Sequence, residues 1–212
     1  MSRLVYCDQK TIDLDACEVV YDTPFTPESL KEDFEAPSGH WSVKDGWLVG
    51  VHRENSGGML YTKQSWDFDL IMEFDAEAIP PCKNDLNFVI KTSGWDSVHH
   101  DAGPGYIFGL GGWWLDKAGI EKYPTCKPRC LTELYPLESG KLYHIIAGVI
   151  DGHCFFYANG KLVCEMYDPA PEDFIGCGKV GFDTYASQIR YKDLRVYRAA
   201  YTERTLEYTA DF

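Results

Sequence analysis

Apolar and polar residues alternate along most of the chain from Trp41 onward, and turn residues interrupt this alternation at short intervals. A period of two predicts β-strands, because successive strand residues point to opposite faces of a sheet. The clearest example lies at 144–167, where Asp151-Gly152 and Asn159-Gly160 separate three apolar runs. Both dipeptides suit two-residue turns with positive φ, so we predict three consecutive antiparallel strands. Further strands are predicted at 46–53, 57–62, 68–78, 86–93, 106–112, 179–185 and 189–198.

This number of strands is typical of two packed sheets, so we predict an all-β protein, a two-sheet antiparallel jelly-roll sandwich. Residues 1–212 form a single domain in this interpretation. Residues 1–40 form an N-terminal extension whose short helix, Pro27–Phe34 with Thr26 as N-cap, packs on the sandwich. A second helical turn is predicted at Pro171–Phe174.

Charge narrows the classes of partner. Lys and Arg number 20 against 33 Asp and Glu, a net charge of −13, which argues against nucleic acid and anionic membranes as partners. The chain has no apolar run of the ~20 residues that a membrane span needs, and its start lacks the apolar core of a signal peptide. We therefore expect a cytoplasmic protein with reduced cysteines. Cys126 and Cys130 form the one close pair, which we interpret as free thiols in a loop rather than a zinc site.

Four motifs carry a family resemblance: Gly57-Gly58, Trp66–Asp69, the Asn159-Gly160 turn and Gly178–Phe182. Their order resembles the concanavalin A-like sandwich of 3-keto-disaccharide hydrolase-like proteins, which are themselves similar to family 16 glycoside hydrolases. The short chain, and the segment 105–112 followed by a long loop, resemble the YesU-like family more closely. The resemblance implies a role in plant-polysaccharide utilisation.

Three carboxylates recur at every second residue of the predicted strand 68–78: Glu73, Asp75 and Glu77. They emerge on one face, where mutual repulsion is expected to raise at least one pKa, as an acid catalyst requires. The spacing resembles the Glu-x-Asp-x-Glu signature of family 16 glycoside hydrolases. That resemblance implies a nucleophile, an electrostatic helper and an acid/base, in this order. The alternative is a solvated outer face.

If this face is concave, the following strand is expected to lie beside it as a hairpin partner and to bring Asp85, Asn87 and Lys91 next to the trio. Asp183 and Tyr185 join from the closing strand and complete a polar groove. Sugars also need aromatic faces, which the two long loops at 93–105 and 113–138 supply. The aromatic candidates are Trp95, Tyr106, Trp113, Trp114 and Tyr123. We expect one of the adjacent pair Trp113-Trp114 to be core and the other to face the groove or a neighbouring subunit.

His99-His100-Asp101 offers a second candidate site, as a divalent-metal site or as acid/base groups near neutral pH. Adjacent histidines do not easily chelate one ion, so a metal would need a third ligand. His52, Glu54 and Asp96 are the candidates for that ligand. The alternative is an exposed polar loop. His144 is interpreted as a structural histidine, and no organic cofactor is expected, because no phosphate loop or nucleophile elbow is present.

Together these patterns favour a carbohydrate-active protein, a glycoside hydrolase or lyase that acts on a small saccharide or glycoside. One alternative is a non-catalytic carbohydrate-binding or assembly domain. Another is a small-molecule enzyme of a different pathway on the same fold. Convergence of the carboxylate trio and His99 on one pocket would favour the enzyme. The aromatic tail 199–212 suggests packing across a second subunit, so we expect a homodimer.

Overall fold

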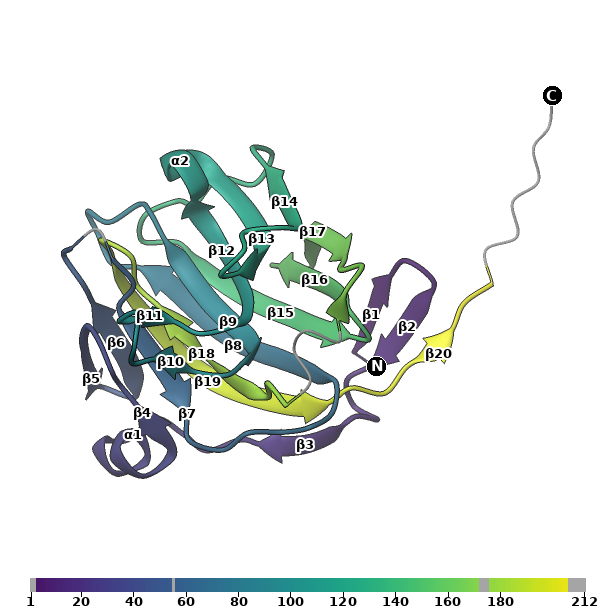
Figure 1. Ribbon diagram of the computed structural model, residues 1–212, viewed down its shortest axis with the longest axis horizontal. Helices are drawn as coiled ribbons and strands as arrows, with labels where there is room; N and C mark the ends of the chain where they lie inside the picture. Colours follow the sequence, from purple (N-terminus) through teal and green to yellow (C-terminus); the bar gives the residue numbers. More distant parts are fainter. Residues whose placement is uncertain (1–2, 55, 172–175, 206–212) are drawn as a thin grey trace.

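Two antiparallel sheets packed face to face form the body of the molecule, as the sequence predicts (Figure 1). The structure is a computed structural model, and it describes residues 3–54, 56–171 and 176–205. The predicted helical turn at Pro171–Phe174 falls largely outside these residues. Within the described residues, no helix has the length and apolar character to cross a membrane.

The first sheet has seven strands in the order β14-β13-β12-β9-β18-β7-β4. On the central strands of this sheet, the residues that point away from the core form the outer face of the sheet. The candidate site lies on this face. The strands are β4 (Phe34–Glu35), β7 (Met59–Thr62), β9 (Leu86–Thr92), β12 (Gly105–Gly112), β13 (Lys117–Tyr123), β14 (Arg129–Thr132) and β18 (Lys179–Asp183). A two-stranded ribbon follows β9 in the chain, made of β10 (Trp95–Asp96) and β11 (Asp101–Ala102).

The second sheet has eight strands: β17-β16-β15-β8-β19-β6-β5 in order, with β3 also paired to β19. The predicted run of three antiparallel strands is confirmed as β15, β16 and β17, and Asp151 and Asn159 adopt positive φ in its two turns. The strands are β3 (Glu18–Tyr21), β5 (His40–Lys44), β6 (Trp47–Val51), β8 (Leu70–Ala78), β15 (Leu142–Ile150), β16 (His153–Ala158), β17 (Lys161–Tyr167) and β19 (Gln188–Arg198).

A cluster of aromatic rings fills the space between the sheets. Phe74 of β8 lies 5.1 Å from Phe88 of β9 and 5.2 Å from Phe182 of β18, measured between ring centroids. Phe108 and Phe156 extend the cluster toward β12 and β16. Because strand side chains alternate, burying these rings sends the residues on either side of each ring to the outer faces. The core therefore decides which polar residues face outward.

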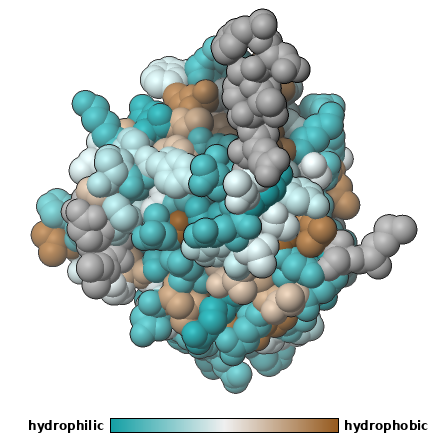
Figure 2. Space-filling view, turned by 90° about the vertical axis from the view of Figure 1, so that its right-hand side faces the viewer, coloured by the Kyte–Doolittle hydropathy of each residue, from teal (hydrophilic) through white to brown (hydrophobic). Residues whose placement is uncertain are grey.

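The first forty residues do more than pack on the sandwich. The strands β1 (Leu4–Cys7) and β2 (Lys10–Asp13) form a hairpin, and the short β20 (Thr202–Glu203) pairs with β2. This three-stranded unit lies against the outer face of the eight-stranded sheet, where Ile12 is fully buried among Ile71, Phe155 and Tyr197. Figure 2 shows this side of the molecule, on which hydrophilic residues predominate and hydrophobic ones are scattered.

Residues 18–35 extend both sheets, because β3 pairs with β19 and β4 pairs with β7. The helix α1 (Pro27–Asp33) lies between them, and Thr26 caps it in a reciprocal box with Ser29, as predicted. Part of the aromatic tail pairs within its own chain through β20, and residues 206–212 lie outside the described residues. The homodimer stays a prediction.

One expectation about strand neighbours is wrong. The strands β8 and β9 follow each other in the chain but do not pair: β8 pairs with β15 and β19, and β9 pairs with β12 and β18. The connection between them crosses from one sheet to the other. Glu73 and Asn87 therefore lie on outer faces on opposite sides of the sandwich, and the predicted shared groove does not form.

Candidate functional site

A pocket of about 220 Å³ opens on the outer face of the seven-stranded sheet, and we call it the Asp183 pocket. Its lining comes from β7, β9, β12, β13 and β18, and from residues just before β7 and β9 and just after β12 and β18. Five of the predicted groove and binding residues line it. The lining residues are Gly57, Met59, Asp85, Asn87, Ile107, Gly112, Trp113, Glu121, Asp183 and Tyr185.

Two carboxylates and one amide share hydrogen bonds in the floor. The Asn87 side-chain nitrogen donates to Asp85 Oδ1 at 3.2 Å and to Asp183 Oδ2 at 3.3 Å. Asn87 Oδ1 and Asp183 Oδ1 are buried and have no hydrogen-bond partner. A buried acceptor without a donor is costly, and such groups in a native protein mark places where an absent water, ion or ligand completes the pairing.

Burial changes the acidity of both carboxyl groups. The pKa of Asp183 rises from 3.8 to about 7: loss of hydration is the main cause, the charges of Asp85 and Asp101 add to it, and hydrogen bonds from Asn87 and the Gly58 backbone oppose it. Burial also raises the pKa of Asp85, against hydrogen bonds from Asn84 and Asn87. Asp183 therefore changes charge near neutral pH, as general acids and charge-sensing binding groups do.

Glycines keep the space around the side-chain oxygens of Asn87, Asp183 and Asp85 open. A Cβ on Gly109 would stand 1.9 Å from Asn87 Oδ1, and one on Gly57 would stand 3.2 Å from Asp183 Oδ1. Gly112 similarly approaches Asp85 Oδ1, at 3.1 Å from where its Cβ would stand. Any larger residue at these positions would fill the pocket or displace its acceptors.

Trp113 forms one wall of the pocket, and its neighbour Trp114 points into solvent with 69% of its surface exposed. The sequence predicts the start of a long loop here, and the structure places a short helix, α2 (Trp113–Asp116), directly after β12. Both tryptophans have positive φ, 33° and 70°, which is strained for bulky residues and is typically tolerated at functional sites. The indole N–H of Trp113 donates to Glu121 Oε2 at 2.9 Å, and Arg129 pairs with the same oxygen at 2.6 Å.

The carboxylate trio lies on the other sheet, where it holds protein groups together. Arg3 donates to both Glu73 oxygens at 2.7 and 2.9 Å, Tyr197 also donates to Glu73, and His144 bridges Glu73 and Asp75. Arg190 pairs with Glu77 at 2.7 Å. The one-face placement of the trio is confirmed.

The rise in pKa expected for at least one carboxyl of the trio does not occur at Glu73. Burial opposes its charge, but hydrogen bonds from His144, Tyr197 and Arg3 prevail and lower its pKa to about 2. Hydrogen bonds to Glu73 and Asp75 raise the pKa of His144, which spans these two carboxylates as a structural histidine. Glu73 is thus a permanently charged anchor and not a carboxylic acid that holds a proton near neutral pH.

The histidine loop is exposed and separate from the trio. His99 Nδ1 lies 2.6 Å from Asp96 Oδ2, a contact that raises the pKa of His99, while 76% of the imidazole side chain stays exposed. Tyr123 donates to Asp101 at the neighbouring ribbon. His100 has a positive φ of 55°. Across 3–54, 56–171 and 176–205, no three His, Cys, Asp or Glu residues are grouped as a metal site requires.

The remaining predicted binding residues lie outside the pocket. Tyr106 is 1% exposed and points into the core, where its hydroxyl donates to Asp168 at 2.6 Å, so its predicted contact with substrate is wrong. Lys91 donates to the Phe68 carbonyl at 3.2 Å. Trp95 packs with Trp113 and Tyr123 against a small apolar cluster beside the pocket.

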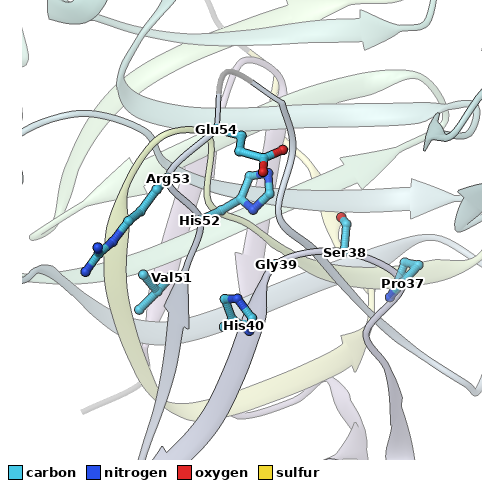
Figure 3. Close-up of a pocket in the computed structure, with 8 residues that line it drawn as sticks. All are labelled: Pro37, Ser38, Gly39, His40, Val51, His52, Arg53 and Glu54. Carbon is cyan, nitrogen blue, oxygen red and sulfur yellow. The ribbon is translucent and has the colours of Figure 1, made fainter.

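A second cavity, of about 590 Å³, opens where β5 meets the end of β6 (Figure 3). His40, His52 and Glu54 are among its lining residues, as Figure 3 shows. His52 also contacts Ser56 Oγ at 2.8 Å. The cavity is larger than the Asp183 pocket, but its polar groups are not among the buried unpartnered atoms. We therefore take the Asp183 pocket as the stronger candidate.

Sequence reasoning missed Glu121 and the glycines of the pocket. Glu121 lies on β13, within the stretch 113–138 whose polar, Pro- and Gly-containing sequence predicts a long loop, and the charged Lys122 among the inward residues hides the strand pattern. Lys122 is buried because it pairs with Asp168 at 2.8 Å. The one available signal was the glycine-rich run in 105–112, whose small residues leave room above a sheet.

No protein-family model matches the sequence, and no curated protein matches it either. Several solved structures share the fold. A protein of unknown function with a galectin-like fold from Bacillus subtilis aligns with a TM-score of 0.66 at 15% identity, over 89% of this chain and 98% of that one. The carbohydrate-binding module CBM66 from Bacillus subtilis aligns with a TM-score of 0.61 at 14% identity, over 78% and 95%.

A prokaryotic β-1,3-1,4-glucanase (lichenase) derived from a mouse hindgut metagenome also aligns, with a TM-score of 0.55 at 12% identity, over 85% of this chain and 98% of the other. At such identities the likeness establishes the fold alone. The predicted concanavalin A-like jelly-roll sandwich is therefore confirmed.

Proposed function

We propose that the protein binds a saccharide in the Asp183 pocket. The observation that carries this proposal is the pair of unpartnered buried acceptors, Asn87 Oδ1 and Asp183 Oδ1, in a glycine-walled pocket beside Trp113. Sugars carry many hydroxyl donors and an apolar C–H face, so they suit a site that combines acceptors with an aromatic wall. Neighbours of this fold include proteins named for carbohydrate binding and for glycan cleavage, which is consistent with a saccharide ligand.

The size of the pocket favours recognition of one sugar ring. Its volume of about 220 Å³ is below the ~300 Å³ at which pockets for drug-sized ligands begin. Tyr185, 40% exposed at the rim, would contact the same ring or the next one.

The resemblance to the YesU-like family stays a prediction, as do the cytoplasmic location and the homodimer.

The two adjacent tryptophans provide a matched test of this proposal. We expect Trp113→Ala to weaken saccharide binding by about tenfold or more, because an aromatic wall in a desolvated pocket is a typical hot spot. Trp114→Ala should leave affinity within about twofold, because Trp114 is exposed and outside the lining. Isothermal titration calorimetry with sugars that bind the wild type on a glycan array measures both. Equal losses in the two variants would contradict the proposal.

Glycoside hydrolysis is a second candidate function, and one observation favours it. Asp183, with its pKa near 7, shares an amide with a second carboxyl group, Asp85, as an acid paired with a carboxylate partner would. Release of reducing ends from a bound oligosaccharide would support it. Loss of that release in Asp183→Asn, with binding retained, would assign the acid. Unchanged release in Asp183→Asn would exclude Asp183 from the chemistry.

A further inference from the structure

The charge of the Asp183 pocket is negative and lacks a counterion. Asp85 and Asp183 line it, and no Lys, Arg or His is among the described lining residues. Glu121, the third carboxylate, is neutralised by Arg129 at 2.6 Å. The other two carboxylates share the amide nitrogen of Asn87, a neutral donor, and Asp85 also accepts from the neutral Asn84 amide at 3.0 Å. Carboxylates in a desolvated site without a cation favour a positively charged ligand.

The hydrogen-bonding groups of the pocket are acceptors in excess of donors. Asn87 commits its amide nitrogen to the two aspartates, and Trp113 commits its indole N–H to Glu121. The unpartnered atoms, Asn87 Oδ1 and Asp183 Oδ1, belong to side chains that are 5% and 4% exposed. A ligand that completes this set must bring donors. A protonated amine brings three and accepts none.

The aromatic wall agrees with this choice. Trp113 places its ring in the lining beside the carboxylates, and tryptophan is the best aromatic partner for a cation. A carboxylate-bearing sugar would meet repulsion from Asp85 and Asp183. An N-acetyl group would replace the charge with a carbonyl acceptor, which the unpartnered acceptors Asn87 Oδ1 and Asp183 Oδ1 cannot pair with.

We infer that the Asp183 pocket selects a saccharide residue with a free amine, an unacetylated hexosamine, over neutral, N-acetylated and acidic sugars. This inference rests on the proposed saccharide-binding function and names its ligand class. The ammonium group would lie between Asp85 and Asp183, against Trp113.

The test compares three tetrasaccharides of the same β-1,4 linkage on the full-length protein: one of glucosamine, one of N-acetylglucosamine and one of glucose. Calorimetry at pH 7 keeps a substantial fraction of both the amines and the Asp183 carboxylate charged, because the pKa of Asp183 is about 7. We expect the glucosamine tetramer to bind about tenfold tighter than the other two, as a charge-assisted hydrogen bond predicts. Asp85→Asn should remove most of this preference, and Asp67→Asn, at an exposed residue, should not.

Equal or tighter binding of the glucose or N-acetylglucosamine tetramer, with dependence on Trp113, would overturn the amine inference and leave the proposed function standing. Binding of none of these sugars, nor of any sugar on a glycan array, would overturn both. A parallel titration with CaCl₂ alone distinguishes a metal ion from an amine. Calcium binding that Asp85→Asn abolishes would overturn the inference in favour of a cation site. The preference in the wild type can be measured even if Asp85→Asn does not fold.

Discussion

At the scale of residues, the two groups of carboxylates differ in what surrounds them. Glu73 receives hydrogen bonds from Arg3, Tyr197 and His144, so it stays charged. Asp183 is as well buried, but its Oδ2 accepts from the neutral Asn87 amide, which it shares with Asp85, and its Oδ1 has no partner. The sequence alone did not separate these cases, because the partners of Glu73 lie up to 124 residues away along the chain.

Asp183 predicts a particular pH dependence of stability. Its pKa is about 7 in the folded protein against 3.8 without burial, so the folded state binds the proton more tightly. Stability from this group is present below about pH 4 and is lost as pH rises toward 7. Asparagine does not ionise, so Asp183→Asn does not undergo this loss of stability. The free energy of unfolding of the variant relative to the wild type should therefore increase by up to about 3 kcal/mol from pH 5 to pH 8.

Urea unfolding at the two pH values measures this difference, and the Asp67→Asn variant, at an exposed position, serves as control. A constant difference between Asp183→Asn and the wild type at both pH values would show that Asp183 is ionised in the folded protein throughout. Asp85 and Asp101, whose charges also raise the pKa of Asp183, are present in both the variant and the wild type.

At the scale of elements, alternation along strands placed most of the sandwich correctly, from β6 to β9 and from β15 to β19. Alternation alone does not predict which strands pair with each other. Chain neighbours β8 and β9 lie in different sheets, and this crossover moves the trio away from Asn87. The strands β13 and β14 were missed because Lys122, paired with Asp168, interrupts the inward apolar pattern.

The N-terminal hairpin β1–β2 depends on the trio for its attachment. Arg3 joins Asp15 at 2.7 Å and Glu73 at 2.7 Å, so it connects the chain before and after the hairpin to β8. We expect Glu73→Gln to lower the free energy of unfolding at pH 6 by about 2 kcal/mol, because charged hydrogen bonds to a buried group are lost. The effect should fade as pH falls from 4.5 toward 2, where the wild-type carboxylate also takes up a proton.

The matched control for this prediction is Glu18→Gln, which breaks an exposed pair with Arg198 and should cost less than about 1 kcal/mol. Saccharide affinity should not change in either variant, since both residues lie on the eight-stranded sheet. A large loss of affinity in Glu73→Gln, with stability retained, would restore the trio as a candidate site.

At the scale of the whole molecule, the net charge of −13 divides into parts with different roles. One part anchors the hairpin and the outer face of the eight-stranded sheet through ion pairs. Another part, Asp85 and Asp183, lines the pocket on the opposite side of the sandwich. The charge argues against nucleic acid as a partner, and the structure places Asp85 and Asp183 in the proposed saccharide pocket.

The most direct test of the central claim is to titrate the ¹⁵N-labelled protein with a saccharide that it binds and to monitor the chemical shifts of the amide and indole N–H groups. The account predicts that the largest shifts occur at Gly57, Gly112 and the Trp113 indole, with little change at 73–77. Largest shifts at Glu73, Asp75 and Glu77, or at the His99 loop, would contradict it and place the ligand on the other candidate sites.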